Sequence, residues 1–404
     1  MAVVRPFRAL RPAPGVASEV ASVPYDVVNV AEARSLAADV PLSFLHVTRP
    51  EIDLPDETDP YATVVYERAR SNLATLRAQA PLVVEDTASL YVYRLRDGQH
   101  EQTGVAGCYS LDEYDSGVIK KHEKTRPDKE DDRTRHMETI GAQTGVVFLT
   151  YRQQPTVDEL VGQVSLAAPL FDFAAADGVQ HTVWRAPAEL TAALVEAFAG
   201  VPTLYIADGH HRAASAARAR RAGAADETAA ARDRFLAVAF PDRQTRILAY
   251  NRTLSDLAGA TPERFLDAVS ARLEVTPDAD PVPVRGATAM YLAGRWYEVT
   301  LAPPARPDDA VGALDVARLQ DQILGPLLKV EDIRTDPRVR FVGGVRGTAA
   351  LEQQVDSGAA AVAFSMAPVR VAELLAVADA GSIMPPKSTW FEPKLRDGLL
   401  THLF

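Results

Sequence analysis

Leu204-Tyr205-Ile206-Ala207-Asp208-Gly209-His210-His211-Arg212 predicts a strand that turns directly into a helix. Residues 204–206 are apolar and indicate a short buried strand, Asp208-Gly209 indicates a turn, and the alanine- and arginine-rich run 213–219 is a strong helix former. A helix N-terminus exposes backbone N–H groups that lack partners and carries the positive end of the helix dipole. The stretch therefore predicts a corner that favours an anion such as phosphate.

The polar residues of this corner strengthen the prediction. Gly209 allows a ligand to approach the backbone closely, or the backbone to adopt a positive φ. His210, His211 and Arg212 add side-chain donors, and Asp208 adds a carboxylate that orients an imidazole or holds Mg²⁺. The alternative is an Asp N-cap beside two surface histidines. Five polar or glycine residues in one corner favour a functional interpretation.

Residues 118–133 predict a second corner of the same kind. A strand is expected to end near His122, and a helix to begin at Pro127 or Asp128, where proline suits the first turn and acidic residues suit the dipole. The residues between supply a base, a carboxylate, a cation and a hydroxyl, which is the equipment of phosphoryl transfer: His122, Glu123, Lys124 and Thr125. The alternative, a solvated helix start, is our interpretation of residues 129–131.

A third dense stretch is Met384-Pro385-Pro386-Lys387-Ser388-Thr389-Trp390-Phe391. Its two prolines stiffen the chain, so the three residues after them would meet a phosphate with little entropy left to lose. Lys387, Ser388 and Thr389 are therefore predicted phosphate or nucleotide ligands, although the glycines of a Walker motif are missing. Four residues at other segment ends are expected to reach the substrate: Tyr25, Asp26, Asn251 and Arg252.

The rest of the chain alternates strands and helices. Hairpins are expected at 89–95 with 104–111 and at 287–292 with 296–301, a strand at 42–47, and paired strands at 235–240 and 247–251. Residues 23–28 are expected to be extended. This alternation predicts a mixed α/β (α+β) fold.

Composition limits the classes of function. The chain has 404 residues, is 47% hydrophobic and carries a formal net charge of −11, which argues against a general nucleic-acid surface. Its single cysteine, Cys108, excludes a disulfide framework, and no apolar run is long enough to span a membrane. The first residues lack the pattern of a signal peptide. We therefore expect a cytoplasmic protein that binds a small phosphate-bearing molecule, without nucleic-acid or membrane partners; a homodimer is left open.

The chain resembles the family known as domain of unknown function 1015 over nearly its whole length. The segments that carry the resemblance are Arg5-Pro6-Phe7-Arg8-Ala9-Leu10-Arg11-Pro12, Pro24-Tyr25-Asp26-Val27-Val28, His122-Glu123-Lys124-Thr125, Ala207-Asp208-Gly209-His210-His211-Arg212 and the stretch from Met384 to Phe391. More distantly, Asp208-Gly209-His210-His211-Arg212 is similar to a signature of the sulfiredoxin, ParB and free-serine-kinase group, in which the motif opens a helix and binds nucleotide phosphates.

The resemblance implies a ParB/sulfiredoxin-like nucleotide-binding core at residues 1–254 and an additional C-terminal α/β domain at 255–404, whose last motif returns to the site. It also implies a kinase of a small hydroxylated, serine-like metabolite, with ATP or ADP as phosphoryl donor. His211 stands where the serine kinases have Thr, so the donor is left open.

The residues are assigned roles on that basis. Gly209, Arg212 and Thr125 would bind phosphate. His122 or Glu123 would take the substrate proton, and Lys124 would neutralise the moving group. Mg²⁺ would use Asp208 or Glu123, and the catalytic set is His122, Glu123, Lys124, Asp208, His210 and His211.

Three alternatives to the kinase are compatible with the same residues. A phosphatase on a small phosphomonoester such as phosphoserine would use the same site, and a nucleotide-binding switch would use it without catalysis. A metal hydrolase built on His122, His210 and His211 ranks lowest, because adjacent residues on a helix point about 100° apart.

Overall fold

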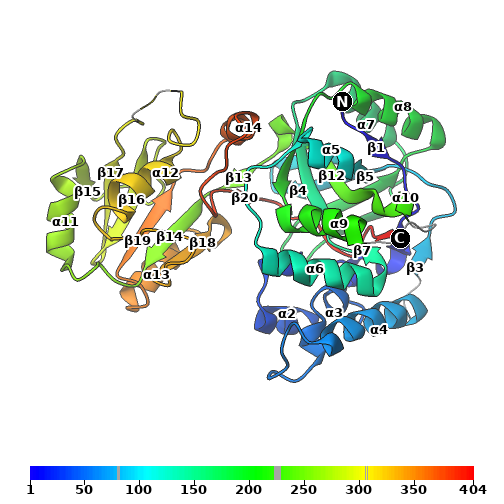
Figure 1. The fold of residues 1–404 in the computed structure, drawn as a ribbon, viewed down its shortest axis with the longest axis horizontal. Coiled ribbons are helices and arrows are strands. Elements are labelled where there is room, and N and C mark those ends of the chain that lie inside the picture. The colour runs from blue at the N-terminus through cyan, green and yellow to red at the C-terminus, as the bar shows by residue number, and fades with distance from the viewer. Residues whose placement is uncertain (80–81, 223–228, 305, 307) are drawn as a thin grey trace. The chain divides into compact units, whose positions relative to one another are not determined.

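The computed structural model describes residues 1–79, 82–222, 229–304, 306 and 308–404, and these form two compact units (Figure 1). Unit 1 comprises residues 1–245 and 393–404, and unit 2 comprises residues 246–392. The expected boundary lay after residue 254. In the structure residues 246–254 belong to unit 2, because β14 (Tyr250–Leu254) pairs with β18 (Val339–Gly343) and β19 (Val362–Met366).

Unit 1 is built on a nine-stranded mixed sheet. Eight strands follow the order β6-β11-β8-β12-β5-β4-β10-β9, and the ninth, β1, pairs with β5. The pairs β6–β11 and β8–β12 are parallel, and the others are antiparallel. The strands are β1 (Val4–Arg5), β4 (Tyr91–Asp97), β5 (His100–Ser110), β6 (Ile119–Lys120), β8 (Val147–Tyr151), β9 (Phe171–Ala174), β10 (Gln180–Arg185), β11 (Leu204–Asp208) and β12 (Arg234–Pro241).

Two helices that contact each other follow the predicted corners. α6 (Pro127–Ile140) begins at its proline, as predicted, and packs against α9 (His210–Ala222) (Figure 1). Four alanines of α9, at positions 213, 214, 216 and 217, are buried in the core with β8 and β12, because their small side chains let the helix approach the sheet closely. The other helices of unit 1 are α1 (Ala17–Val20), α2 (Val30–Ala37), α3 (Leu45–Thr48), α4 (Thr63–Gln79), α5 (Leu111–Ser116), α7 (Pro155–Val164), α8 (Ala188–Ala199) and α10 (Ala229–Arg232).

Short strand pairs complete unit 1. β2 (Leu10–Pro12) pairs with β3 (Leu82–Val84), and β21 (His402–Leu403) pairs with β7 (Ala142–Gln143). The second pair joins residues 393–404 to the end of α6. We call residues 393–404 the closing segment.

Unit 2 is built on a six-stranded sheet in which every pair is antiparallel, in the order β15-β17-β16-β19-β14-β18. Its other strands are β15 (Val275–Pro277), β16 (Ala287–Leu292) and β17 (Arg295–Thr300), and its helices are α11 (Pro262–Ser270), α12 (Asp315–Leu319), α13 (Ala349–Asp356) and α14 (Val371–Asp379). A separate pair joins β13 (Ile247–Leu248) to β20 (Trp390–Phe391). The predicted hairpin of residues 287–292 with 296–301 is confirmed as β16 and β17. Its turn, Ala293-Gly294, has both residues at positive φ.

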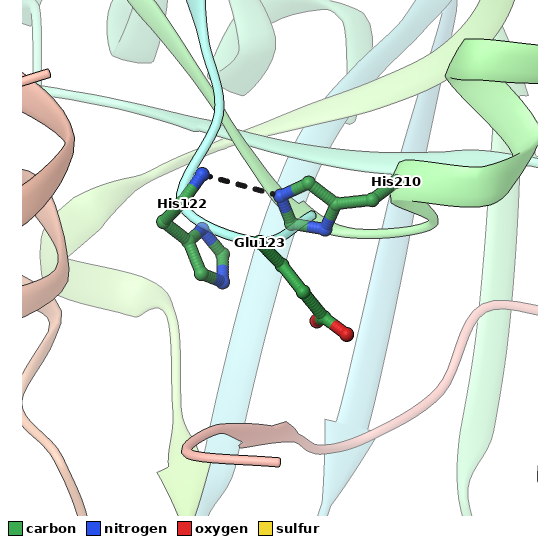
Figure 2. Close-up of side chains that lie close together, drawn as sticks. All are labelled: His122, Glu123 and His210. Atoms are coloured by element: carbon green, nitrogen blue, oxygen red, sulfur yellow. Dashed lines mark hydrogen bonds between the residues drawn. The ribbon is translucent and has the colours of Figure 1, made fainter. Parts of the chain in front are cut away.

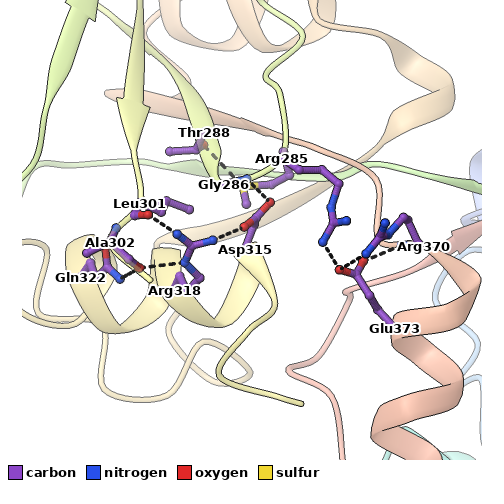
Figure 3. Close-up of polar contacts among 11 residues, drawn as sticks. Arg285, Gly286, Thr288, Leu301, Ala302, Asp315, Arg318, Gln322, Arg370 and Glu373 are labelled. Atoms are coloured by element: carbon purple, nitrogen blue, oxygen red, sulfur yellow. Dashed lines mark hydrogen bonds and ion pairs between the residues drawn. The ribbon is translucent and has the colours of Figure 1, made fainter. Parts of the chain in front are cut away.

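Charged side chains fasten the helices of unit 2 to the chain around its sheet. Arg318 of α12 bonds Asp315 and the carbonyl groups of Leu301 and Ala302, which follow β17 (Figure 3). Glu373 of α14 contacts Arg285 and Arg370 in the same view. These contacts fix α12 and α14 to the neighbouring chain, so we assign a structural role to Arg318 and Glu373.

Three local predictions were wrong. Residues 42–47 do not form a strand: α3 (Leu45–Thr48) lies there, and Phe44 and Val47 pack into one apolar cluster with α4. Residues 23–28 are not wholly extended but contain a 3₁₀ turn, Tyr25–Val27. Residues 235–240 do not pair with residues 247–251, because β12 pairs with β5 and β8 of unit 1. Short apolar runs suit a strand or a buried helix equally, and sequence does not name their partners.

Both units combine helices and strands, which confirms the mixed α/β class. The hairpin of β4 and β5 is also confirmed. Within the described ranges, no helix is both long and apolar enough to cross a membrane.

Candidate functional site

The two predicted corners meet at one edge of the unit 1 sheet. β6 and β11 lie side by side and parallel, with Ile119 opposite Leu204 and Lys120 opposite Tyr205. Strands that run the same way end at the same edge, so the loop after β6 and the turn after β11 come together. The backbone N–H of His122 lies 3.4 Å from Nε2 of His210, and the two rings meet edge to face with centroids 4.4 Å apart (Figure 2).

Glu123 joins the two histidines. The three side chains point toward a common space (Figure 2), and one ligand atom from each lies within 4.8 Å of the others. His122 and His210 are buried, and Glu123 is half-buried. Burial lowers the pKa of His122 to about 4. Burial and the nearby His122 hold the pKa of His210 well below its usual range. Both rings are therefore neutral at pH 7, so each keeps a nitrogen lone pair for a proton or a metal.

Asp208, the last residue of β11, faces the closing segment. Its carboxylate pairs with Lys394 at 2.9 Å and accepts the N–H of Gly209, also at 2.9 Å. Burial opposes ionisation, but Lys394 and Arg212 outweigh it and hold the pKa of Asp208 far below its usual range. Gly209 has φ +92°, the left-handed region that glycine tolerates best, and this turns the chain into α9.

Arg212 is committed to contacts inside the protein. Its Nη2 lies 2.8 Å from both carboxylate oxygens of Asp26, and its Nη1 donates to the Val146 carbonyl at 2.6 Å. Only 6% of the residue is exposed. Because these bonds join α9, the start of β8 and the N-terminal segment, we now expect Arg212 to position the site.

The other predicted residues of unit 1 are Tyr25, Lys124, Thr125 and His211. Tyr25 lies under the guanidinium of Arg133, and burial raises its pKa. A cavity beside it is lined by Tyr25, Arg133, His136, Gly145 and Arg212, among others. Nε2 of His211 accepts the backbone N–H of Arg126, at 3.1 Å, and the Thr125 hydroxyl bonds Glu130. Lys124 is exposed.

Five predicted residues belong to unit 2. Arg252 is buried and donates to the carbonyl groups of Tyr250 and Lys387. Asn251 accepts the Met366 N–H at 2.9 Å. Ser388 donates to the Pro385 carbonyl, and Lys387 has φ +55°; Thr389 is half-buried. That Asn251, Arg252, Lys387, Ser388 and Thr389 complete the site of unit 1 stays a prediction.

Comparison with known proteins places the chain in a family. The sequence model described as "Protein of unknown function (DUF1015)" matches residues 4–317. The chain belongs to the DUF1015 family. This confirms the resemblance drawn from the motifs. Comparison with curated proteins gives no match.

Three solved structures are similar to this DUF1015 protein over part of their length. A conserved hypothetical protein from Pyrococcus furiosus is 15% identical, covers 73% of this chain and 93% of its own, and has a TM-score of 0.34. A free serine kinase in complex with AMP is 13% identical, with coverages of 71% and 86% and a TM-score of 0.35. SbnI with a C-terminal truncation, from Staphylococcus aureus, is 12% identical, with coverages of 73% and 86% and a TM-score of 0.40.

The closing segment supplies two charged residues that the sequence predictions did not assign. Lys394 pairs with Asp208, and Asp397 lies near Asp26 and Arg212. Burial raises the pKa of Asp397 to about 7, although Arg212 lowers it. The available signal was the presence of charged residues among the apolar Leu395, Leu399 and Leu400, all of which are buried.

The donors at the corner do not fit a protein-bound Mg²⁺. Mg²⁺ prefers oxygen ligands in octahedral geometry. Asp208, one expected ligand, is held by Lys394 and by the Gly209 N–H. Glu123, the other, lies with two imidazoles. No step of the function proposed below is therefore assigned to Mg²⁺ held by these residues.

Proposed function

We propose that this DUF1015 protein is a phosphoryl-transfer enzyme, and in the leading form a nucleotide-dependent kinase of a small hydroxylated, serine-like metabolite. The observation that carries the proposal is the meeting of two strand-to-helix corners. It brings His122, Glu123 and His210 together where α9 begins. Bases and an anion-favouring helix N-terminus at one point are what phosphoryl transfer requires.

Each group has a role that follows from its surroundings. The first backbone N–H groups of α9, reached past Gly209, would hold phosphate oxygens. Glu123 is our choice of general base, because the lowered pKa of His122 makes that imidazole a weak base at pH 7. Lys124, which is exposed on the same loop, would neutralise charge on the transferred group. Lys387, Ser388 and Thr389 keep their proposed role as further phosphate ligands.

A phosphatase is the second candidate, and the pair of neutral histidines favours it. A neutral imidazole next to a phosphate is a nucleophile, so His122 or His210 would accept the phosphoryl group and water would release it. The net reaction would be hydrolysis of a small phosphomonoester such as phosphoserine. The anion cradle would be the same for both reactions, so the residue types alone do not separate them.

Phosphorus-31 NMR tests the proposal. The full chain is incubated with ATP or ADP and added magnesium, against a panel of hydroxylated amino acids and, separately, small phosphomonoesters. A new phosphomonoester signal supports the kinase, and free phosphate from a phosphomonoester supports the phosphatase. Glu123→Gln should lower either rate at least about a hundredfold. The control Asp128→Asn should not, because Asp128 is exposed and forms an ion pair with its sequence neighbour Arg126. Nucleotide binding without turnover would contradict the proposed enzyme and would favour the alternative of a non-catalytic nucleotide-binding switch.

A further inference from the structure

We propose that His122, Glu123 and His210 form a binding site for a divalent first-row transition metal, of the Mn²⁺ to Zn²⁺ series, rather than for Mg²⁺. The inference goes beyond phosphoryl transfer, because metal binding is measured without a substrate. It keeps Glu123 as a metal ligand, replaces the other expected ligand, Asp208, by two histidines, and changes the expected metal.

The first support is geometric. The ligand atoms of the three side chains lie within 4.8 Å of one another. Metal bonds of about 2.0–2.2 Å to nitrogen and oxygen place neighbouring ligands roughly 3–4 Å apart. Small rotations of the side chains would therefore close the set around one ion.

The second support is the state of His122. The residue is 2% exposed, and its ring lies near enough to the Ile206 carbonyl for one nitrogen to donate to it. The other ring nitrogen has no hydrogen-bond partner within the described part of the chain. A buried polar group without a partner costs about 1–3 kcal/mol, and such groups require an explanation. His210 receives a long contact, in which the backbone N–H of His122 lies 3.4 Å from its Nε2. A bound metal would satisfy a lone pair that the protein leaves unused.

The third support is the chemistry of the donors. Two neutral imidazoles and one carboxylate suit zinc and the neighbouring transition metals, whereas Mg²⁺ selects oxygen. Three protein ligands also leave positions open, which distinguishes a reactive site from a structural zinc site with four. A phosphate oxygen or water would fit there.

A control residue is built into the same helix. His211 follows His210, but the two side chains point about 100° apart on a helix, and its Nε2 accepts the Arg126 N–H. His211 lies outside the cluster of three. A His211→Ala variant therefore removes an adjacent imidazole without removing a proposed ligand.

The experiment is a titration of the chelator-treated full chain with Co²⁺, followed by visible absorption, then competition with Zn²⁺ and with Mg²⁺. We expect one Co²⁺ per chain, displaced by one equivalent of Zn²⁺ and retained in millimolar Mg²⁺. Glu123→Gln and His122→Ala should each weaken Co²⁺ binding by at least about tenfold, and His211→Ala should not.

Two results would overturn the inference: no stoichiometric Co²⁺ binding by the wild type, or equal binding by wild type, Glu123→Gln and His122→Ala. Circular dichroism and a thermal melt check that each variant is folded. Glu123→Gln keeps the inference testable if the buried His122 cannot be replaced, because Glu123 is half-buried and glutamine keeps its shape. Co²⁺ binding without any phosphoryl transfer would support the metal site while contradicting the proposed function.

Discussion

At the scale of single residues, Asp397 links stability to pH. Its folded pKa, raised by burial to about 7, lies above the usual value of 3.8. Between those two values the folded state holds a proton that the unfolded state has lost, so the free energy of unfolding falls as pH rises. We expect Asp397→Asn to gain stability over the wild type from pH 5 to pH 7, by at most about 1.4 kcal/mol per pH unit.

Urea denaturation at pH 5, 6, 7 and 8 measures this difference. Asp112→Asn is the control, because that carboxylate is 89% exposed and its surface ion pair with Arg220 contributes little to stability. Denaturation curves of wild type and Asp397→Asn that keep the same separation at every pH would contradict the assignment.

Arg212 is a second single residue on which stability is expected to depend. Arg212→Ala should lower the free energy of unfolding by about 2–4 kcal/mol, because it removes the partner of Asp26 and the donor to Val146. Arg212→Lys should recover only part of the loss, since one ammonium group does not span both partners as a guanidinium does. Thermal and urea unfolding measure both variants. Wild-type stability in Arg212→Ala would show that the guanidinium is not a structural anchor.

At the scale of elements, the turn from β11 into α9 depends on Gly209. A Cβ at this position would lie 3.2 Å from Nη1 of Arg212 and 3.4 Å from Cα of Val147, in a backbone with φ +92°. Gly209→Ala should therefore cost about 1–2 kcal/mol and disturb the start of α9. Gly162→Ala in α7 is the matched control, because a Cβ there meets nothing within 4 Å, and alanine favours the helix. Equal stability of the two variants would contradict a strained turn.

Elements with local signals could be predicted from the sequence. The turn at Asp208-Gly209, the start of α6 at Pro127 and the hairpin at Ala293-Gly294 each depend on a few adjacent residues, and each lies where expected. Residues 42–47 gave an ambiguous signal, because a short apolar run suits either element and packing against α4 decides it.

Contacts between segments that are distant in the sequence could be predicted only in part. His122 and His210 were both named because each follows a strand, and the parallel pairing of β6 and β11 brings them together. Lys394 and Asp397 were not assigned, because nothing near Asp208 or Asp26 in the sequence indicates which distant charge will face them. The commitment of Arg212 to Asp26 was hidden for the same reason.

At the scale of the whole molecule, unit 1 is discontinuous, and the closing segment completes it. Lys394 pairs with Asp208, residues 401 and 10 exchange backbone hydrogen bonds, and β21 pairs with β7. Removal of residues 393–404 should therefore destabilise unit 1 and leave the thermal transition of unit 2 near its original temperature. Calorimetry with limited proteolysis identifies which unit unfolds, and unit 2 serves as the internal control. An unchanged thermal transition of unit 1 would show that the closing segment does not stabilise it.

The same discontinuity imposes an order on biosynthesis. A ribosome releases residues 246–392 before residues 393–404, so the antiparallel sheet of unit 2 can form on the nascent chain while β7 still lacks its partner. Until translation reaches Lys394, the newly made Asp208 has no ammonium group beside it. The closing segment, which is made after unit 2, therefore completes a unit whose other strands are made before unit 2.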